Sequence, residues 1–366
     1  MRLLFVTQYG ESAASSRTRV FQYIPYLKEH GHHCRILSVV KDQNILGSQL
    51  SVETNPFRKM FYYIFVAWRT LFSGVQVVSH GRNSDVIFIQ KVVFPALLRW
   101  AIKRLRAVVI FDFDDAIFTT EVQERNWLAR YKLHRNEIGV PAMLKISKLA
   151  IVENEYNASF AKDYVSNIGI ITGPIDTLNY NRGQEKMPTR DDSRVVLGWI
   201  GSATTLPYLL EICEILEKIG REYSNVCLNV IGATKIHLRE MEVISHSWSI
   251  ETEVDKLMKF DIGLMPVPDN AWTKGKGGYK LLQYMSMGLP VIASPVGINR
   301  DIVSHGQDGF LASDRKEWED FLRILIEDRM LRECMGERGR KKIEDKYSLQ
   351  RSQSYLEELI IQTAVN

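Results

Sequence analysis

The sequence predicts an α/β protein of two domains, each built around a doubly wound parallel sheet. Two observations predict this fold class. Short apolar runs of strand length alternate with amphipathic segments of helix length, and this alternation stops at a polar stretch near the middle of the chain and then starts again. The chain has 366 residues, which suits two domains of ordinary size. We therefore expect two Rossmann-like domains that face each other across a central cleft.

The first series of alternating segments runs from residue 3 to residue 171. Its apolar runs contain few polar residues, which is typical of parallel strands that are covered on both faces. Its helical segments gather their apolar residues on one side. We expect strands at residues 3–6, 34–39, 86–90, 108–112, 148–152 and 168–171, and helices at residues 17–30, 57–81 and 95–106.

A polar stretch at residues 179–194 separates the two series, and its Gly183, Pro188 and clustered charges predict a linker. We expect an N-terminal domain at residues 1–178, a C-terminal domain at residues 195–346, and a helix at residues 347–366 that crosses back to the N-terminal domain. In the second series we expect strands at residues 195–200, 226–231, 262–266 and 291–293, and helices at residues 206–222, 251–259, 280–287, 318–328 and 330–346.

The overall charge and the cysteines limit the classes of function. The chain has 47 lysines and arginines against 43 aspartates and glutamates, so its formal net charge is +4. This charge is too small to indicate nucleic acid as a partner, although it suits an anionic small molecule or a membrane surface. The four cysteines are far apart and lack metal-ligand spacing, so we expect a cytoplasmic protein with reduced Cys34, Cys213, Cys227 and Cys334.

No segment is expected to act as a signal peptide or to cross a membrane. The first apolar run ends at Thr7, which fits a strand. The most apolar helical stretch, residues 60–72, contains Arg69 and is shorter than the roughly 20 residues that a span needs. The wider stretch of residues 55–106 combines basic and aromatic residues, which could dock on an anionic membrane. We favour the alternative that its helices pack their apolar sides on the sheet.

A glycine-rich loop that carries lysines precedes the helix expected at residues 280–287. The glycines strip side chains from a turn that leads into a helix, so backbone N–H groups there can point at an anion, and the lysines at positions 274, 276 and 280 add positive charge. The alternative is a loop that needs glycine for positive φ, with its lysines in solvent. The candidate phosphate-binding residues are Lys276, Gly277, Gly278, Tyr279 and Lys280.

Loops after other strands carry further candidates, because ligands of open α/β sheets bind beyond the carboxyl ends of the strands. Gly201, Ser202 and Thr204 join a strand to a helix and could donate hydrogen bonds to a diphosphate, although helix capping also explains the hydroxyls. After the first strand, Arg17 or Arg19 could bind an anion. The alternative there is a helix cap formed by a neighbouring serine.

An acidic motif, Asp112-Phe113-Asp114-Asp115, follows the strand expected at residues 108–112. Carboxylates this close together are costly unless they hold a metal, bind a polyol or stay solvated. We expect Asp114 or Asp115 to act as an acid or base that faces an acceptor. The alternative is that one of them caps a helix.

The second half of the chain resembles the group 1 family of retaining glycosyltransferases, glycogen-synthase-like enzymes with two facing Rossmann domains, the GT-B fold. The resemblance covers nearly all of the C-terminal half, and it extends more loosely to the first half through S-S-R-T-R-V-F-Q-Y and D-F-D-D-A-I-F. Its motifs stand at the spacing expected in the family: G-W-I-G-S at 198–202, V-I-G at 230–232, F-D-I-G-L-M-P at 260–266, Y-K-L-L-Q-Y-M-S-M-G-L-P-V-I-A-S-P-V-G at 279–297, D-G-F-L at 308–311 and Y-S at 347–348.

The resemblance implies a nucleotide diphosphate sugar on the C-terminal domain and an acceptor on the N-terminal domain. In the family, two glutamates eight positions apart hold the donor. The first position is Gly275 here, which has no side chain, and the second is Gln283, whose amide can bind the ribose. The family's diphosphate-binding basic residues are absent after Gly201, so we expect Lys276 and Lys280 to neutralise the diphosphate.

We therefore expect a glycosyltransferase that moves a hexosyl unit from a uridine-linked donor to a hydroxyl of a glycan or lipid-linked acceptor, with retention. Fixed cations would stabilise the leaving diphosphate without a metal or another cofactor. Asp114 or Asp115 would orient or deprotonate the acceptor, and the family's histidine falls at or near Asp114. Two alternatives stay open: a nucleotide-sugar epimerase, and a non-catalytic sugar-nucleotide-binding protein, which the missing side chain at Gly275 would suit.

Overall fold

The computed structural model describes residues 1–42, 56–119, 127–181, 194–233 and 236–365. The chain divides into two compact units. Unit 1 comprises Met1–Pro174, Asn270–Gly277 and Gln350–Asn366, and unit 2 comprises Ile175–Asp269 and Gly278–Leu349. The glycine-rich segment Asn270–Gly277 therefore groups with unit 1, although the sequence places it inside the C-terminal domain. Most of the expected linker, residues 182–193, lies outside the described residues.

Unit 1 is built on a parallel six-stranded sheet with the order β2-β1-β3-β4-β5-β6. Each strand predicted from the sequence forms, because these runs are almost continuously apolar and the sheet is covered on both faces. The strand order reverses between β1 and β3, and ligands of such sheets bind beyond the carboxyl ends at this point. The strands are β1 (Arg2–Tyr9), β2 (His33–Val40), β3 (Val86–Gln90), β4 (Val108–Phe113), β5 (Leu149–Val152) and β6 (Ile168–Ile170).

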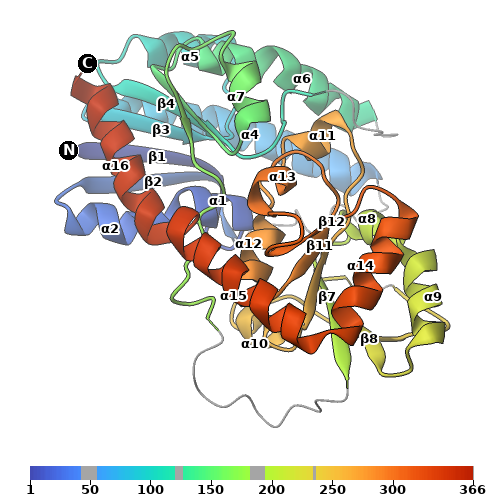
Figure 1. The fold of residues 1–366 in the computed structure, drawn as a ribbon. Helices are drawn as coiled ribbons and strands as arrows, with labels where there is room; N and C mark the ends of the chain where they lie inside the picture. The colour runs from blue at the N-terminus through green and yellow to red at the C-terminus, as the bar shows by residue number, and fades with distance from the viewer. Residues whose placement is uncertain (43–55, 120–126, 182–193, 234–235, 366) are drawn as a thin grey trace. The chain divides into compact units, whose positions relative to one another are not determined.

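The helices of unit 1 cover this sheet (Figure 1). The helix expected at residues 17–30 is interrupted, because Pro25 lacks an N–H group and begins a new helix instead of continuing the old one. Three of the helices in the described part of unit 1 were not predicted: α6, α7 and the short α11. The helical elements are α1 (Ala14–Arg19), η1 (Phe21–Tyr23), α2 (Ile24–Glu29), α4 (Pro56–Gly81), α5 (Ala96–Lys103), α6 (Trp127–Leu144), α7 (Glu155–Ala161), α11 (Ala271–Lys274) and α16 (Leu349–Val365).

The C-terminal helix α16 joins the rest of unit 1 through specific polar contacts. The Glu357 carboxylate accepts hydrogen bonds from the Tyr26 hydroxyl at 3.0 Å and pairs with the His32 Nε2 atom at 2.9 Å. Leu356 and Ile360 of the same helix are buried. Elements from the two ends of the chain therefore form one unit, and α16 lies along the first sheet in Figure 1.

Unit 2 is built on a second parallel six-stranded sheet, with the order β12-β11-β10-β7-β8-β9. Numbered within the unit, this is the Rossmann order 6-5-4-1-2-3, whose reversal point lies between β7 and β10. The edge strands β9 and β12 were not predicted. The strands are β7 (Val195–Ile200), β8 (Val226–Ile231), β9 (Glu242–His246), β10 (Ile262–Met265), β11 (Val291–Ala293) and β12 (Gly309–Leu311).

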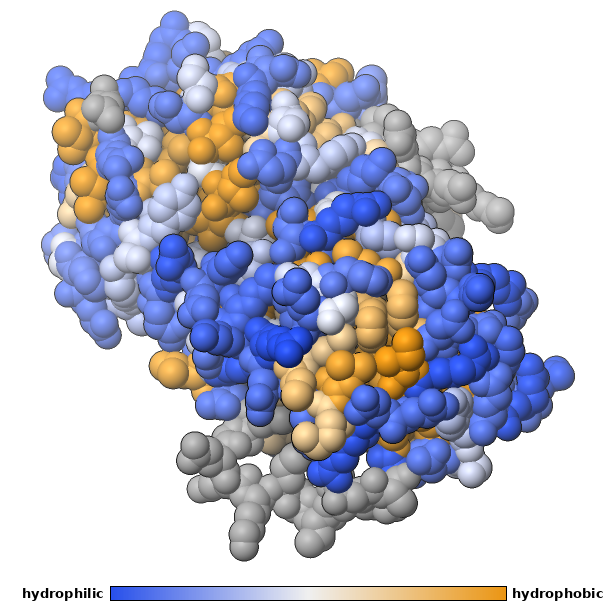
Figure 2. Space-filling model, viewed as in Figure 1, coloured by the Kyte–Doolittle hydropathy of each residue, from blue (hydrophilic) through white to orange (hydrophobic). Residues whose placement is uncertain are grey.

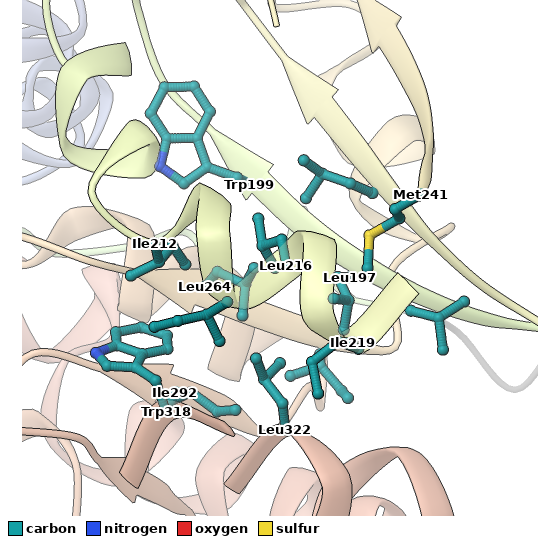
Figure 3. Close-up of a cluster of buried hydrophobic side chains, with 14 of the residues drawn as sticks. Leu197, Trp199, Ile212, Leu216, Ile219, Met241, Leu264, Ile292, Trp318 and Leu322 are labelled. Atoms are coloured by element: carbon teal, nitrogen blue, oxygen red, sulfur yellow. The ribbon is translucent and has the colours of Figure 1, made fainter. Parts of the chain in front are cut away.

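The helices of unit 2 pack an apolar core against this sheet. Figure 3 shows leucine and isoleucine side chains from β7, β10 and β11 pointing toward those of α9 and α14, and Trp199 of β7 is fully buried at the edge of the cluster. The helices are α8 (Leu206–Leu210), α9 (Cys213–Glu222), α10 (Glu253–Leu257), α12 (Tyr279–Ser286), α13 (Asn299–Ile302), α14 (Arg315–Glu327) and α15 (Arg329–Lys346). On the face drawn in Figure 2, hydrophilic residues predominate and hydrophobic residues form smaller patches between them.

Candidate active site

The first acidic residue after β4, Asp112, is a structural partner of Arg19. The side chains of both residues are at most 2% exposed, and the Arg19 Nε atom lies 3.2 Å and 3.1 Å from the two Asp112 carboxylate oxygens. The Arg19 guanidinium also donates to the Ile171 carbonyl. The expectation that Arg19 binds a ligand anion is therefore wrong, because buried protein acceptors already occupy its donors.

Glu153, at the end of β5, is a second buried carboxylate on the same guanidinium. One of its oxygens lies 3.3 Å from the Arg19 Nη1 atom, and the other accepts a hydrogen bond of 2.7 Å from the Gly173 N–H. One cation thus faces two carboxylates. Burial raises the pKa of Glu153 to about 8, and Arg19 only partly opposes this effect. Burial likewise raises the pKa of Asp112 to about 6. No sequence pattern marks Glu153, which follows an ordinary apolar strand.

Glu153 should make the stability of the protein depend on pH. Its pKa is about 8 in the folded protein, against the ordinary glutamate pKa of 4.5 in the unfolded chain, so between these values the folded state holds a proton that the unfolded chain has lost. The contribution of Glu153 to the free energy of unfolding should therefore fall as the pH rises through this window, by on the order of 1 kcal/mol per pH unit. Urea unfolding between pH 6 and pH 8 measures it. Glu153→Gln should show a shallower decline, and identical declines in both proteins would contradict the assignment.

The other two acidic residues, Asp114 and Asp115, share Lys91. The Lys91 Nζ atom lies 2.6 Å from Asp114 Oδ1 and 2.7 Å from Asp115 Oδ2, and Lys276 Nζ lies 3.8 Å from the other Asp115 oxygen. Burial alone would lower the pKa of Lys91, but the two carboxylates outweigh it and raise the pKa, so Lys91 stays charged. Lys91 occupies the position between the carboxylates that a metal cation would need.

Lys91 also has an unusual backbone. Its φ is +60°, and it is the one residue other than glycine with positive φ in the part of the chain that the structure describes. Such a conformation is strained for a residue with a side chain, and strain of this kind is concentrated at functional sites. Lys91 follows β3 directly, at the reversal point of the first sheet, so the strained residue carries its ammonium group to the edge where a ligand is expected.

Asp115 and Lys91 lie at one side of a cavity of about 610 Å³ within unit 1. The rest of the wall is largely apolar and aromatic. Asp114 is not part of this wall, so Asp115 is the carboxylate of the acidic motif that a molecule in the cavity would meet. The apolar and aromatic lining residues include Met60, Tyr63, Ile64, Ile117 and Trp272.

The glycine-rich segment Asn270–Gly277 of unit 1 packs against the residues that follow β4 and β5, at the carboxyl ends of the strands of the first sheet. Asn154 donates from its amide to the Lys274 and Lys276 carbonyls at 3.1 Å and 3.0 Å, and Asn157 donates to the Gly275 carbonyl at 3.0 Å. A Cβ at Gly275 would lie 2.6 Å from the Ala116 backbone nitrogen. These contacts explain the glycine at position 275: the loop backbone lies directly against Ala116, the residue that follows the acidic motif.

Gly277 and Gly278 are glycines for different reasons. A Cβ at Gly277 would collide with the Glu153 carboxyl group, so this position requires close approach rather than a special φ. Gly278 has a φ of +65° and precedes the first turn of α12. A positive φ favours glycine, and this was the alternative to anion binding in the sequence analysis. Within the described residues, no backbone or side-chain acceptor takes the N–H group of either glycine.

In unit 2, the structure brings Gly201 and Lys280 together. The Lys280 Nζ atom lies 4.1 Å from the centre of the Trp199 ring, and a Cβ at Gly201 would lie 2.6 Å from that nitrogen. Gly201 follows β7 and Lys280 lies in the first turn of α12, so this ammonium group stands at the carboxyl end of β7. Lys276 is not part of this group, because it belongs to unit 1.

The remaining predicted residues of unit 2 have protein partners. The Ser202 and Thr204 hydroxyls lie 2.6 Å apart, and neither caps α8, which has no side-chain cap. Gln283 is 4% exposed, and its amide donates to the Glu253 carboxylate at 2.8 Å. The Glu253 carboxylate also accepts hydrogen bonds from the Tyr180 hydroxyl and the Trp248 indole. Glu253, the hydrogen-bond partner of Gln283, was not among the residues predicted from the sequence. The last predicted residue, Tyr279, precedes Lys280 and is half-buried.

Part of the chain is similar in sequence to a known protein family. Residues 194–328 match the model of the family "Glycosyl transferases group 1". A curated relative, the capsular polysaccharide biosynthesis glycosyltransferase CapM of Staphylococcus aureus, is 24% identical over 188 residues. That match covers 47% of this chain and 47% of CapM, so it spans about half the length of the relative.

Solved structures resemble the chain over nearly its whole length. HepE of Anabaena, in complex with UDP and glucose, has a TM-score of 0.67 at 14% identity and covers 99% of this chain and 100% of its own. Sucrose-phosphate synthase of Thermosynechococcus elongatus has a TM-score of 0.70 at 14% identity, with 99% of each chain covered. WaaG, a glycosyltransferase involved in lipopolysaccharide biosynthesis, has a TM-score of 0.68 at 17% identity and covers 96% of this chain and 99% of its own. At these identities the likeness shows the fold, and it confirms the predicted class of two parallel sheets with helices.

Proposed function

We propose that the protein transfers a hexosyl unit from a nucleotide diphosphate sugar to a hydroxyl of a glycan or lipid-linked acceptor, because residues 194–328 match the model of the group 1 glycosyltransferase family. The observation that carries this proposal is the Lys280 ammonium group beside Gly201, at the reversal point of the second sheet. A uridine-linked donor is favoured by HepE, whose structure holds UDP and glucose.

On the donor side, the diphosphate would meet a fixed cation and backbone donors. Lys280 supplies the charge, Gly201 leaves room beside it, and the Gly278 N–H group stands at the start of α12. We assign the ribose to the neighbourhood of Gln283, whose amide is oriented by Glu253. Ser202, Thr204 and Tyr279 complete the candidate donor residues. A helix N-terminus and an ammonium group together stabilise the negative charge that develops on a leaving diphosphate.

On the acceptor side, Asp115 would orient or deprotonate the attacking hydroxyl. It lines the cavity of unit 1, whereas Asp114 does not, so the cavity favours Asp115 of the two candidates. Lys91 and Lys276 hold the Asp115 carboxylate in place. The apolar and aromatic walls favour the lipid-linked member of the two acceptor classes, since a free glycan offers little apolar surface.

The chemical step is a substitution at the anomeric carbon. The bond from that carbon to the diphosphate oxygen breaks, the acceptor oxygen forms a new bond to the same carbon, and the acceptor proton passes to a base. Attack on the face that the diphosphate leaves would retain the anomeric configuration. The residues above supply positioning and charge, which need no metal ion in this scheme.

A donor screen followed by a transfer assay tests the proposal. A nucleotide sugar at 100 times its Kd should stabilise the protein by about 2.7 kcal/mol in thermal unfolding, which identifies the base and the sugar. Transfer of that sugar to a lipid-linked or glycan acceptor is the expected result. Free epimerised nucleotide sugar without an acceptor would favour the epimerase. Binding without hydrolysis or transfer across an acceptor panel would favour the non-catalytic alternative.

Lys280→Met should weaken the binding of UDP at least tenfold, because a hydrogen bond to a charged group contributes roughly 1.5–3 kcal/mol. Methionine keeps an apolar chain over Trp199 while it removes the charge. Calorimetry with UDP and with uridine separates the two effects, since uridine has no diphosphate and should bind both proteins equally. Lys274→Met, in the same loop but in unit 1, is the matched control and should bind UDP as the wild type does. Equal UDP affinity of Lys280→Met and wild type would overturn the diphosphate assignment.

A further inference from the structure

The outer side of α4 is an exposed apolar surface. Phe61, Trp68 and Val75 are 66%, 58% and 61% exposed, and they stand seven residues apart, so they lie on one side of the helix. The neighbouring helix α5 adds Leu97, which is 75% exposed. Soluble proteins rarely expose so many large apolar side chains together without a partner. The α4–α5 face is defined by Phe61, Ile64, Trp68, Leu71, Phe72, Val75, Leu97 and Trp100.

The inner side of α4 fixes the helix to unit 1. Thr70, Ser73 and Val77 are buried, and the Arg69 Nε atom donates to the Val39 carbonyl of β2 at 2.9 Å. By length and composition, Met60–Gly81 could cross a membrane, so the expectation that no stretch is long enough is wrong: the helix continues past Phe72. Its attachment to the sheet nevertheless keeps α4 on the surface of the unit, with one side buried and one side exposed.

The charges around this face are of one sign. Neither α4 nor α5 contains an acidic residue, and Asp85 is the one acidic residue in the whole stretch 56–106. Asp85 pairs with Arg2. Exposed basic residues border the apolar side chains, and the Arg104 guanidinium lies 3.6 Å from the centre of the Trp100 ring. These basic residues are Arg58, Lys103, Arg104 and Arg106.

Exposed apolar side chains bordered by basic residues favour one of the partners that could cover the α4–α5 face. A second copy of the chain in a symmetric contact would place the same basic residues against each other, with no acidic residue of α4 or α5 to pair with them. A bilayer with anionic headgroups offers both an apolar interior for the aromatic side chains and negative charge for the basic residues. In the sequence analysis we favoured the alternative that both helices bury their apolar sides on the sheet. That alternative accounts only for the inner side of α4.

We propose that the α4–α5 face docks unit 1 on the surface of an anionic lipid bilayer, with the aromatic side chains in the interface and the bordering basic residues at the headgroups. Docking does not depend on the transfer reaction, so a variant without transferase activity would still bind the bilayer. It also bears on the acceptor, since Met60 and Ile64 of the same helix line the cavity beside Asp115. A lipid-linked acceptor would thus reach this cavity from the membrane on which the helix rests.

Co-sedimentation with vesicles tests the docking surface. The full chain should bind vesicles of phosphatidylcholine and phosphatidylglycerol at low salt, bind pure phosphatidylcholine more weakly, and lose the difference near 1 M salt, where the Debye length is about 3 Å. The double variant Lys103→Gln/Arg106→Gln should bind anionic vesicles about 25-fold more weakly at low salt, since each basic residue near such a surface contributes about fivefold. Trp68→Gln/Phe72→Gln should weaken binding at least tenfold on both kinds of vesicle.

Matched controls change the same residue types elsewhere on the surface. Leu178→Gln/Met330→Gln removes two exposed apolar residues of unit 2, and Lys316→Gln/Lys341→Gln removes two exposed charges there. Both should bind vesicles as the wild type does. No binding to anionic vesicles at low salt would overturn the proposal, and so would equal losses in the control variants. A dimer in solution that Trp68→Gln/Phe72→Gln converts to a monomer would show that a second copy covers the face instead.

Discussion

Asp115→Asn is expected to lower hexosyl transfer at least 100-fold, with little effect on the affinity for UDP. A positioned general base contributes about 10²–10⁴ to the rate, and asparagine keeps the shape of the side chain but cannot take a proton. The substitution also removes the charge that Lys91 and Lys276 face. Steady-state transfer with saturating donor measures the loss in kcat, and calorimetry with UDP shows whether the donor site is intact.

Asp114→Asn is the matched control for this prediction. Asp114 makes the same kind of ion pair with Lys91, at 2.6 Å, but it does not line the cavity of unit 1. Its substitution should therefore cost much less transfer activity than Asp115→Asn. A larger loss with Asp114→Asn would reverse the assignment of the two carboxylates. Full activity of both variants would remove the acidic motif from the mechanism.

Arg19→Met is expected to lower the free energy of unfolding by about 3–5 kcal/mol. Removal of one partner from a buried ion pair leaves an uncompensated buried charge, and here that charge is the Asp112 carboxylate. Arg17→Met in the same helix is the control. The Arg17 side chain is only half-buried, so its loss should change the free energy of unfolding by no more than about 0.5 kcal/mol. Urea unfolding at pH 7 measures both variants.

The loss caused by Arg19→Met should shrink as the pH falls. Without the guanidinium, the burial that raises the pKa values of Asp112 and Glu153 loses its main opponent, and only the Lys91 charge and the Gly173 N–H group still oppose it. Both groups then become neutral at a higher pH than in the wild type, and a neutral carboxyl is far less costly to bury. The difference between variant and wild type should therefore be smaller at pH 5 than at pH 8. A difference that stays constant would mean that Arg19 stabilises the fold by packing rather than by charge.

The strands could be predicted from the sequence wherever a run was apolar and covered on both faces. β3 and β8 form at the predicted residues, because each is fully buried and its burial leaves little choice of register. β9 was missed because it is an edge strand of mixed polarity, with no residue of its five fully buried. Helix α6 was missed for a related reason: its polar and apolar residues are not separated onto two sides, and Pro141 lies inside it.

The glycine-rich loop shows which part of the candidate site could not be predicted from the sequence. Its lysines and glycines could be singled out from composition, but the residues that hold it are distant in the sequence. Asn154 lies 120 residues before Lys274 and 122 before Lys276, so no local pattern connects them. The sequence therefore assigned Lys276 and Lys280 to one cradle, whereas the structure gives the first to the acidic cluster of unit 1 and the second to the edge of the other sheet.

The contacts of Glu357 also determine when unit 1 can finish folding during synthesis. Tyr26 and His32 leave the ribosome early, but their partner belongs to the last segment of the chain. All residues of unit 2 are made before α16 is complete, although domains ordinarily fold in the order of their synthesis. The half of the protein that is synthesised first thus cannot complete its fold until α16, which follows unit 2 in the chain, has been made.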